Sequence, residues 1–246
     1  MLTMVLLTMA QRMYTLKLWV SLYRNHGTGI VSWERGFGTV ELAKNVHWLE
    51  NMKGSYVYLV LGQEPVLIDT GMPNKGTQLE QELGKLGVKL GDIAHVLLTH
   101  HDVDHIGNAK WLQDRSEAKL WAPELDLPYI HGTAKRPGIK RVIGALVRAS
   151  SPKVESIYKP GQKIGDLEVI ETPGHTPGHV SILYNDILFA GDLVMSKSGK
   201  LRPSPKLMTW DSSQLRQSLN KLANYSFDWV CPAHGGPVEH GSFKNL

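Results

Sequence analysis

The stretch Thr99-His100-His101-Asp102-Val103-Asp104-His105-Ile106-Gly107 decides the fold, because it places three histidines and two aspartates within six consecutive residues. It begins at the end of a short apolar run, 94–99, that the pattern predicts to be a strand, and it is followed by a predicted helix at about 108–114. In α/β folds the chemistry usually lies where strands end. Imidazole and carboxylate groups together suit a zinc, iron, manganese or cobalt ion.

Similar polar segments follow other predicted strands along the chain. They are Ile68-Asp69-Thr70-Gly71, Thr172-Pro173-Gly174-His175-Thr176-Pro177-Gly178-His179, Gly191-Asp192 and His234-Gly235. So many ligand-type side chains cannot all pair with one another, and burying them without a partner would carry a desolvation cost. Metal binding removes that cost, so the sequence predicts a metal centre built from several loops.

Around these segments the hydrophobic pattern predicts strands, helices, strands and a final helix within one domain. The predicted strands are 46–49, 55–62, 65–69, 94–99, 119–121, 163–171, 179–184, 187–190 and 228–231. The predicted helices are 76–86, 108–114, 139–148 and one that opens at Asp211, where Gln214 completes a capping-box pattern. The proline-rich residues 123–159 are interpreted as an insertion that covers the site.

Composition narrows the class of protein further. The chain has 246 residues, of which 42% are hydrophobic and 20% charged, so wholesale disorder is excluded. Cys231 is the single cysteine, which excludes an internal disulfide, a cysteine-based zinc cluster and an iron–sulfur site within one chain. The net charge of +4 is dispersed in short pairs, with no extended basic stripe. We therefore expect a small-molecule substrate rather than a nucleic acid.

The N-terminal segment allows several readings. Residues 1–10 are apolar, but no basic region precedes them, and Arg12 and Lys17 interrupt the run before it could span a membrane. We therefore expect a cytoplasmic protein without stable membrane insertion. The alternation over 14–22 predicts a half-buried strand, and the alternative is that Met13 is the natural start. The apolar residues 1–12 are a candidate contact for a homodimer.

These motifs resemble those of the metallo-β-lactamase superfamily, whose five motifs recur here in order. The resemblance covers about 46–236, and the Thr172–His179 segment is similar to the glyoxalase II and lactonase-like branches. It implies an α+β fold, a four-layer αββα sandwich with the metal site at one edge between two sheets. We expect this domain over 46–246, with residues 1–45 as an extension packed on it.

The resemblance also implies a dinuclear centre for two divalent ions, zinc in the first place and manganese or iron as alternatives. The implied ligands of the first ion are His100, Asp102 and His179, and those of the second are Asp104, His105 and His234, with Asp192 bridging both. Asp69 and His175 would hold the ligand loops by hydrogen bonds.

One position departs from the family pattern, because Asp102 stands where a second histidine is usual. A carboxylate still offers an anionic oxygen, but it is shorter and harder than an imidazole. We expect it to weaken the first metal site or to shift its preference towards manganese or iron.

The implied reaction is hydrolysis of an ester, lactone or thioester by a metal-bound hydroxide, with promiscuous cleavage of phosphoesters or β-lactams as a side activity. Asp104 is the candidate proton shuttle. The alternative on the same fold is a mononuclear iron dioxygenase of the persulfide type, which Asp102 keeps open by altering one of the two sites. A binding module without activity is a third alternative, disfavoured by the seven ligand-type residues in place.

Overall fold

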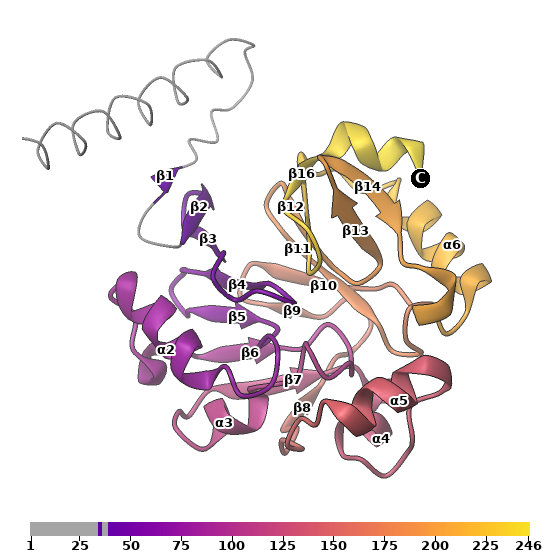
Figure 1. Ribbon diagram of the computed structural model, residues 1–246. Helices are drawn as coiled ribbons and strands as arrows, with labels where there is room; N and C mark the ends of the chain where they lie inside the picture. Colours follow the sequence, from indigo (N-terminus) through magenta and orange to yellow (C-terminus); the bar gives the residue numbers. More distant parts are fainter. Residues whose placement is uncertain (1–33, 36–38) are drawn as a thin grey trace, which may run out of the picture. The chain divides into compact units, whose positions relative to one another are not determined.

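The computed structural model describes residues 34–35 and 39–246, and most of its strands form two sheets (Figure 1). In the first sheet the strands follow chain order from β1 to β8. They are β1 (Glu34–Arg35), β2 (Val40–Ala43), β3 (Val46–Leu49), β4 (Val57–Val60), β5 (Val66–Ile68), β6 (His95–Leu97), β7 (Lys119–Ala122) and β8 (Ser156–Ile157). Neighbours from β1 to β5 are antiparallel, and those from β5 to β8 are parallel.

The second sheet has the order β16-β15-β12-β11-β10-β9. Its strands are β9 (Lys163–Ile164), β10 (Leu167–Glu171), β11 (Val180–Tyr184), β12 (Ile187–Gly191), β15 (Trp229–Pro232) and β16 (Val238–Glu239). Only β12 and β15 pair in parallel, through the crossover that carries α6 (Ser212–Leu222). A separate hairpin is made by β13 (Val194–Lys197) and β14 (Lys200–Pro203).

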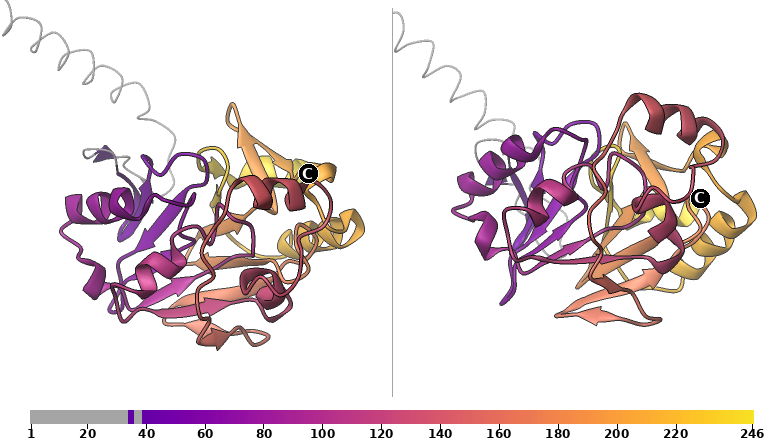
Figure 2. Two further views of the ribbon diagram at one scale, coloured as in Figure 1. Left: turned by 60° about the horizontal axis from the view of Figure 1, so that its bottom comes forward. Right: turned by 90° about the horizontal axis from the view of Figure 1, so that it is seen from below.

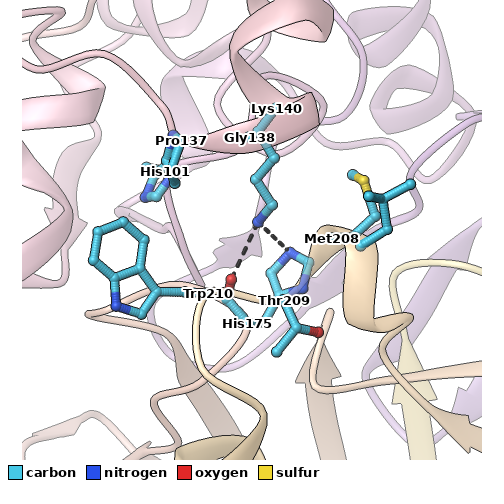
Figure 3. Close-up of a pocket in the computed structure, with 9 residues that line it drawn as sticks. His101, Pro137, Gly138, Lys140, His175, Met208, Thr209 and Trp210 are labelled. Carbon is cyan, nitrogen blue, oxygen red and sulfur yellow. Dashed lines mark hydrogen bonds between the residues drawn. The ribbon is translucent and has the colours of Figure 1, made fainter.

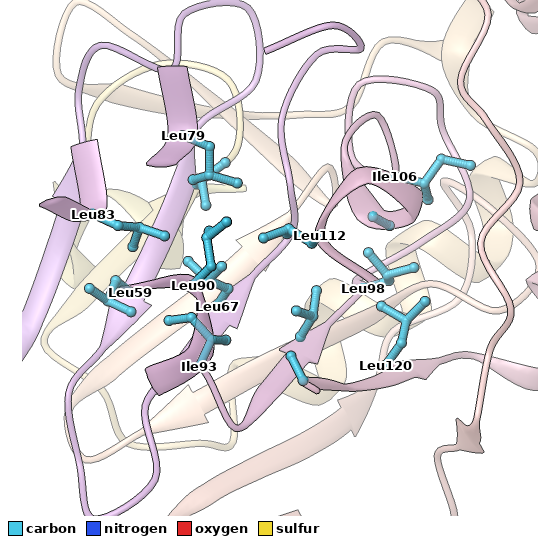
Figure 4. Close-up of a cluster of buried hydrophobic side chains, with 14 of the residues drawn as sticks. Leu59, Leu67, Leu79, Leu83, Leu90, Ile93, Leu98, Ile106, Leu112 and Leu120 are labelled. Carbon is cyan, nitrogen blue, oxygen red and sulfur yellow. The ribbon is translucent and has the colours of Figure 1, made fainter. Parts of the chain in front are cut away.

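Two helices cover the outer face of the first sheet. They are α2 (Gly76–Lys85) and α3 (Ala109–Gln113), and the intervening 3-10 turn η1 (Leu90–Asp92) joins the same layer. Figure 4 shows their apolar side chains meeting those of the strands: Leu79 and Leu83 of α2 pack in one buried cluster with Leu59 and Leu67. The recurrence of leucine at 79, 83 and 86 is the periodicity that predicts this helix.

A second apolar cluster lies between the sheets and a third lies under α6. Tyr58 and Ile68 of the first sheet pack with Ile182 and Phe189 of the second. On the other face of the second sheet, Leu188 and Val230 pack against Leu215, Leu219 and Leu222 of α6. The order of layers is therefore helix, sheet, sheet, helix, and Figure 2 shows the strands enclosed between the helices. The expected four-layer αββα sandwich is confirmed.

The last helix begins where its sequence signal predicts. Asp211 is the N-cap of α6, and its side chain accepts hydrogen bonds from the backbone N–H groups of Ser213 (2.7 Å) and Gln214 (3.1 Å). The Gln214 side chain in turn donates to Asp211 at 3.2 Å. These bonds satisfy backbone donors that have no partner within the helix.

The insertion at 123–159 holds more helix than the sequence predicts. Besides α5 (Gly138–Leu146) it contains η2 (Glu124–Asp126) and the short α4 (Leu127–Ile130). The helix α5 lies against the 3-10 turn η3 (Lys206–Met208), and Val142 and Leu146 are exposed. Within the insertion, α5 therefore packs on the loop that carries η3.

Two features depart from the expectations. The boundary expected at residue 45 separates β2 from β3, which are adjacent strands of one sheet, so the main domain begins before it. The hairpin β13–β14 is missed because its strands are short and mixed, although Ser198 and Gly199 both have positive φ, as two-residue hairpin turns require. The expectations for residues 1–12 and 14–22 lie outside the described residues.

Helices long and apolar enough for a membrane span do not occur in the described part of the chain. The C-terminal residues form a 3-10 helix, η4 (His240–Asn245), in which Phe243 is buried in the cluster under α6.

Candidate metal centre

Strands of both sheets deliver the ligand-type side chains to one place. Asp69 follows β5, and the His100–His105 loop follows β6 in the first sheet. In the second sheet, Asp192 follows β12 and His234 follows β15. Because β5 and β6, and likewise β12 and β15, are parallel, their carboxyl ends lie at the same edge of each sheet.

Seven of these side chains form two adjoining clusters. We call His100, Asp102, His175 and Asp192 the first cluster, and Asp104, His105 and His234 the second cluster. Within each cluster the residues offer one nitrogen or oxygen atom apiece within 4.8 Å of the others. Asp192 lies between the clusters: its Oδ1 is 3.4 Å from His105 Nε2, and its Oδ2 is 3.3 Å from His234 Nε2 and 3.5 Å from His175 Nε2.

Three of the histidines are held through Nδ1, which leaves Nε2 directed inward. His105 Nδ1 is 2.8 Å from Asp69 Oδ2, and His175 Nδ1 is 2.8 Å from the hydroxyl of Ser204. His100 Nδ1 is 3.0 Å from the hydroxyl of Thr99. An outer partner of this kind fixes the tautomer and the ring orientation of a metal ligand. Asp69 therefore lies where the sequence predicts it, behind the ligand loop.

The donor atoms suit a divalent cation. Among the described residues, the buried atoms His100 Nε2, Asp102 Oδ1 and Asp192 Oδ1 have no hydrogen-bond partner. Unpaired buried polar atoms are costly, and imidazole with carboxylate is the donor set that zinc, manganese and iron accept. The unpaired Asp192 Oδ1, which lies 3.4 Å from His105 Nε2, therefore fits a metal ion at the second cluster.

The structure corrects the expectation for the Thr172–His179 segment, because His175 and His179 exchange roles. His179 Nε2 accepts the backbone N–H of Asp192 at 3.1 Å, and its Nδ1 lies 3.1 Å from the carbonyl oxygen of Thr172. Both ring nitrogens are thus engaged in holding the backbone, and His179 is not in either cluster. His175, expected as a supporting residue, faces the carboxylates instead.

The local backbone explains why His175 points inward. The turn that carries it lies against the start of α6, where Asp211 donates its backbone N–H to the carbonyl oxygen of Gly174 at 2.9 Å. Gly174 has φ +137°, and a Cβ there would lie 2.3 Å from the backbone nitrogen of Leu215. Only glycine allows so close an approach, so this contact fixes the turn.

The charges around the two clusters differ. Burial and the neighbouring His105 lower the pKa of His100 well below its usual value. Burial also acts to lower the pKa of His234, but the carboxylates of Asp192 and Asp104 outweigh it and raise that pKa to about 10. Around the second cluster the negative charge of the carboxylates thus outweighs the effect of burial. A site with this excess of negative charge attracts a cation.

Several residues near the clusters carry no signal in the sequence. Lys140, from α5, is buried with its Nζ 2.7 Å from Asp102 Oδ2. Asp126 accepts hydrogen bonds from the backbone N–H groups of His101 and Gly178 and from the Thr176 hydroxyl. His101 is buried, and its ring stacks on Tyr129 with centroids 4.4 Å apart.

Two pockets open beside the clusters. The first pocket, of about 290 Å³, is shown in Figure 3 and is lined by His101, Pro137, Gly138, Lys140, His175, Leu207, Met208, Thr209 and Trp210. The second pocket, of about 310 Å³, is lined by Met195, Ser196, Lys197, Arg202, Pro203, Pro205, His234 and Gly235. Both linings are largely apolar. The first pocket adjoins the first cluster, and the second carries two cationic side chains and adjoins His234.

The comparisons of this chain with known proteins agree on one protein family. A family model described as the metallo-beta-lactamase superfamily matches residues 52–234. The probable metallo-hydrolase YflN of Bacillus subtilis (strain 168) is 26% identical over 235 residues, covering 83% of this chain and 89% of that protein. A hydroxyacylglutathione hydrolase of Thiobacillus denitrificans is 32% identical over 170 residues, covering 69% of this chain and 56% of that protein.

A solved structure from the same family resembles this chain. The subclass B3 metallo-beta-lactamase BJP-1 of Bradyrhizobium japonicum superposes with a TM-score of 0.65 and 26% identity, covering 82% of this chain and 79% of that one. The chain belongs to the metallo-beta-lactamase superfamily, and it is a metallo-hydrolase of that superfamily.

Proposed function

We propose that this enzyme hydrolyses a carboxylic ester, lactone or thioester with an apolar acyl group. The observation that carries the proposal is the first pocket, where Leu207, Met208 and Trp210 provide an apolar lining that reaches His175. Apolar lining with a few convergent polar groups is typical of small-molecule sites. The hydroxyacylglutathione hydrolase relative is named for cleavage of an acyl group from glutathione, which also favours acyl transfer to water.

We assign the metal to the second cluster, with the neighbouring Asp192 carboxylate. Asp104, His105 and His234, together with Asp192, would hold a divalent ion, which when bound lowers the pKa of a water molecule and so supplies the nucleophile. Asp69 keeps the His105 proton on Nδ1, so that the Nε2 lone pair is free for the ion.

Asp104 is the proposed proton acceptor. Its Oδ2 lies 3.2 Å from His234 Nε2, and its side chain is 22% exposed, whereas Asp102 and Asp192 are almost fully buried. A carboxylate at the exposed side of the site can take a proton from the attacking water and release it to solvent.

The substitution Asp104→Asn tests this role. It keeps an oxygen at the position but removes the basic group, so kcat should fall by about 10²–10⁴-fold, the usual contribution of a positioned base. The measurement is steady-state hydrolysis with the metal content determined in parallel. Full turnover with unchanged metal content would refute the role of Asp104.

The apolar pocket predicts a preference for longer acyl chains. We would compare p-nitrophenyl esters of increasing acyl length, lactones, thioesters and a bis-aryl phosphodiester. Trp210→Ala should raise KM for the long acyl esters and leave acetate esters unchanged, because only the long chains reach the apolar lining. Leu146→Ala is the matched control, since Leu146 is 80% exposed and does not line the pocket.

The proposal is wrong if the enzyme cleaves the phosphodiester faster than every acyl substrate. It is also wrong if Trp210→Ala and Leu146→Ala change KM alike for all chain lengths.

A second candidate function follows from the donor set of the second cluster. Asp104, His105 and His234 provide two imidazoles and one carboxylate, which is also the set that holds iron in many non-haem oxygenases. For the persulfide dioxygenase alternative, the purified protein should contain iron and consume oxygen with a persulfide. Zinc or manganese, with no oxygen uptake, favours the hydrolase.

A further inference from the structure

Lys140 carries a positive charge into the middle of the first cluster. Its Nζ lies 2.7 Å from Asp102 Oδ2, 2.9 Å from His175 Nε2 and 3.2 Å from the carbonyl oxygen of His175. Figure 3 shows the side chain descending from α5 towards the His175 ring. An ammonium group has three N–H donors and no acceptor, so these three neighbours satisfy all of its protons.

The His175 ring is arranged as it would be around a metal ion. Its Nδ1 is 2.8 Å from the Ser204 hydroxyl, and its Nε2 faces Lys140. His175 Nε2 also lies 3.0 Å from Asp102 Oδ2, and with the ring proton on Nδ1 its lone pair accepts a hydrogen bond from the Lys140 ammonium, which can only donate. A metal ligand has the same tautomer, with the ion in place of the ammonium. Lys140 therefore uses the lone pair that an ion would need.

Lys140 also balances the charge of Asp102 without a metal ion in this cluster. Asp102 is 5% exposed, and a buried carboxylate requires a cationic partner. Lys140 supplies that partner and is itself 6% exposed, so both charges of the pair are buried. A carboxylate at position 102 holds an ammonium far better than a neutral imidazole would. The departure from the family motif at Asp102 and the presence of Lys140 thus explain each other.

The second cluster has no such built-in cation. In the described part of the chain, Asp104 forms ion pairs with His105 and His234, and Asp192 forms them with histidines alone. Neither carboxylate forms an ion pair with a lysine or arginine there, so no ammonium or guanidinium takes the position that a metal ion would occupy.

We propose that the Lys140 ammonium occupies the first cluster in place of a metal ion, so that the protein binds one divalent ion, at the second cluster. The second positive charge of the centre is then a side chain supplied by the insertion. This inference rests on the proposed metal site, but it does not depend on which substrate the enzyme cleaves.

The test is the number of ions that the full-length protein binds. The protein is stripped with a chelator and titrated with Zn²⁺ and, separately, with Mn²⁺ by calorimetry, and the bound metal is measured per chain after gel filtration. The wild type should bind one ion per chain. Two ions per wild-type chain, each bound with comparable affinity, would overturn the inference whatever the variants do.

Substitution of Lys140 gives the second arm. Lys140→Met removes the charge while keeping the length, so Asp102 and His175 become free and the bound metal should rise from one to two ions per chain. Arg141→Met is the matched control: Arg141 is the exposed neighbour on the same helix, and the count should stay at one.

A folded Lys140→Met protein that still binds one ion shows that the ammonium is not what excludes the second, and the inference fails. If that variant does not fold, Asp102→His with Lys140→Met removes both charges of the pair and should bind two ions. Loss of hydrolysis with an unchanged ion count would count against the proposed function instead.

Discussion

The two clusters of the metal centre have the same kinds of ligand but different surroundings. In the first cluster His100, His175 and both carboxylates are buried, and Lys140 from the insertion lies against Asp102. In the second, the side chains of Asp104 and His234 are 22% and 23% exposed, and their ion-pair partners within the described residues are one another, His105 and Asp192. Similar motifs therefore lie in different surroundings here, and we propose that Lys140, a residue outside the motifs, decides what the first cluster binds.

The largest expected difference between the clusters is in metal content. His234→Asn removes a ligand of the second cluster, so affinity should fall by more than the 10–100-fold that an outer partner usually contributes. His175→Asn alters the first cluster, where Lys140 and not an ion is proposed, so one ion per chain should remain. Elemental analysis of both variants checks this. An ion lost from His175→Asn and kept in His234→Asn would reverse the comparison.

A smaller effect on metal affinity is expected from Asp69, which lies behind the second cluster. Asp69 accepts hydrogen bonds from the backbone and the hydroxyl of Thr99 and lies against His105 Nδ1. Asp69→Asn should weaken metal binding by about 10–100-fold, because the His105 ring loses its orienting partner. Calorimetric titration measures this. Asp126→Asn is the control, since Asp126 is also a buried carboxylate with hydrogen bonds to the backbone but faces His101. Equal losses in both variants would show a general effect of destabilisation.

The exchange of roles between His175 and His179 predicts a stability effect. Burial lowers the pKa of His179 to about 3, so its ring stays neutral at working pH and can accept the Asp192 N–H. In His179→Leu the buried backbone N–H of Asp192 has no acceptor. This loss should lower the free energy of unfolding by about 1–3 kcal/mol. The metal count should stay at one. Urea denaturation and elemental analysis together test this, and a loss of metal with unchanged stability would return His179 to the ligand set.

The smallest expected effect is the loss, at acid pH, of the folding stability that Asp126 contributes. Burial alone would raise the pKa of Asp126, but hydrogen bonds from His101, Thr176 and Gly178 lower it. A carboxyl with a lowered folded-state pKa stabilises the fold above its unfolded pKa of about 3.9 and loses that contribution as the pH falls through the folded-state value. The stability difference between wild type and Asp126→Asn should therefore be largest near pH 7 and shrink below about pH 4. A difference that grows with acidity would contradict the assignment.

Much of the centre could be predicted from the sequence because ligand residues follow strands. The ends of parallel strands meet at one edge of a sheet, so Asp69, Asp192 and His234 could be placed together without knowing the packing of side chains. The strands β3 and β12 and the cap of α6 at Asp211 likewise follow from local patterns. These are features in which short-range signals and the fold agree.

The remaining features depend on contacts that no local pattern carries. His175 and His179 both follow glycines that lie against distant segments, Gly174 against Leu215 and Gly178 against Pro123 and Asp126, and these contacts set which ring faces the carboxylates. Lys140 reaches His175 across 35 residues of sequence, from an insertion whose composition predicts only a cover for the site. Such placements are set by tertiary packing, which periodicity and motif spacing do not encode.

The most direct test is a crystal structure of the metal-loaded protein, with anomalous diffraction collected at the absorption edge of the bound metal. One anomalous peak among Asp104, His105, His234 and Asp192, with Lys140 Nζ still against Asp102, is the predicted result. Two peaks of similar height, with Lys140 turned out of the first cluster, would contradict the account.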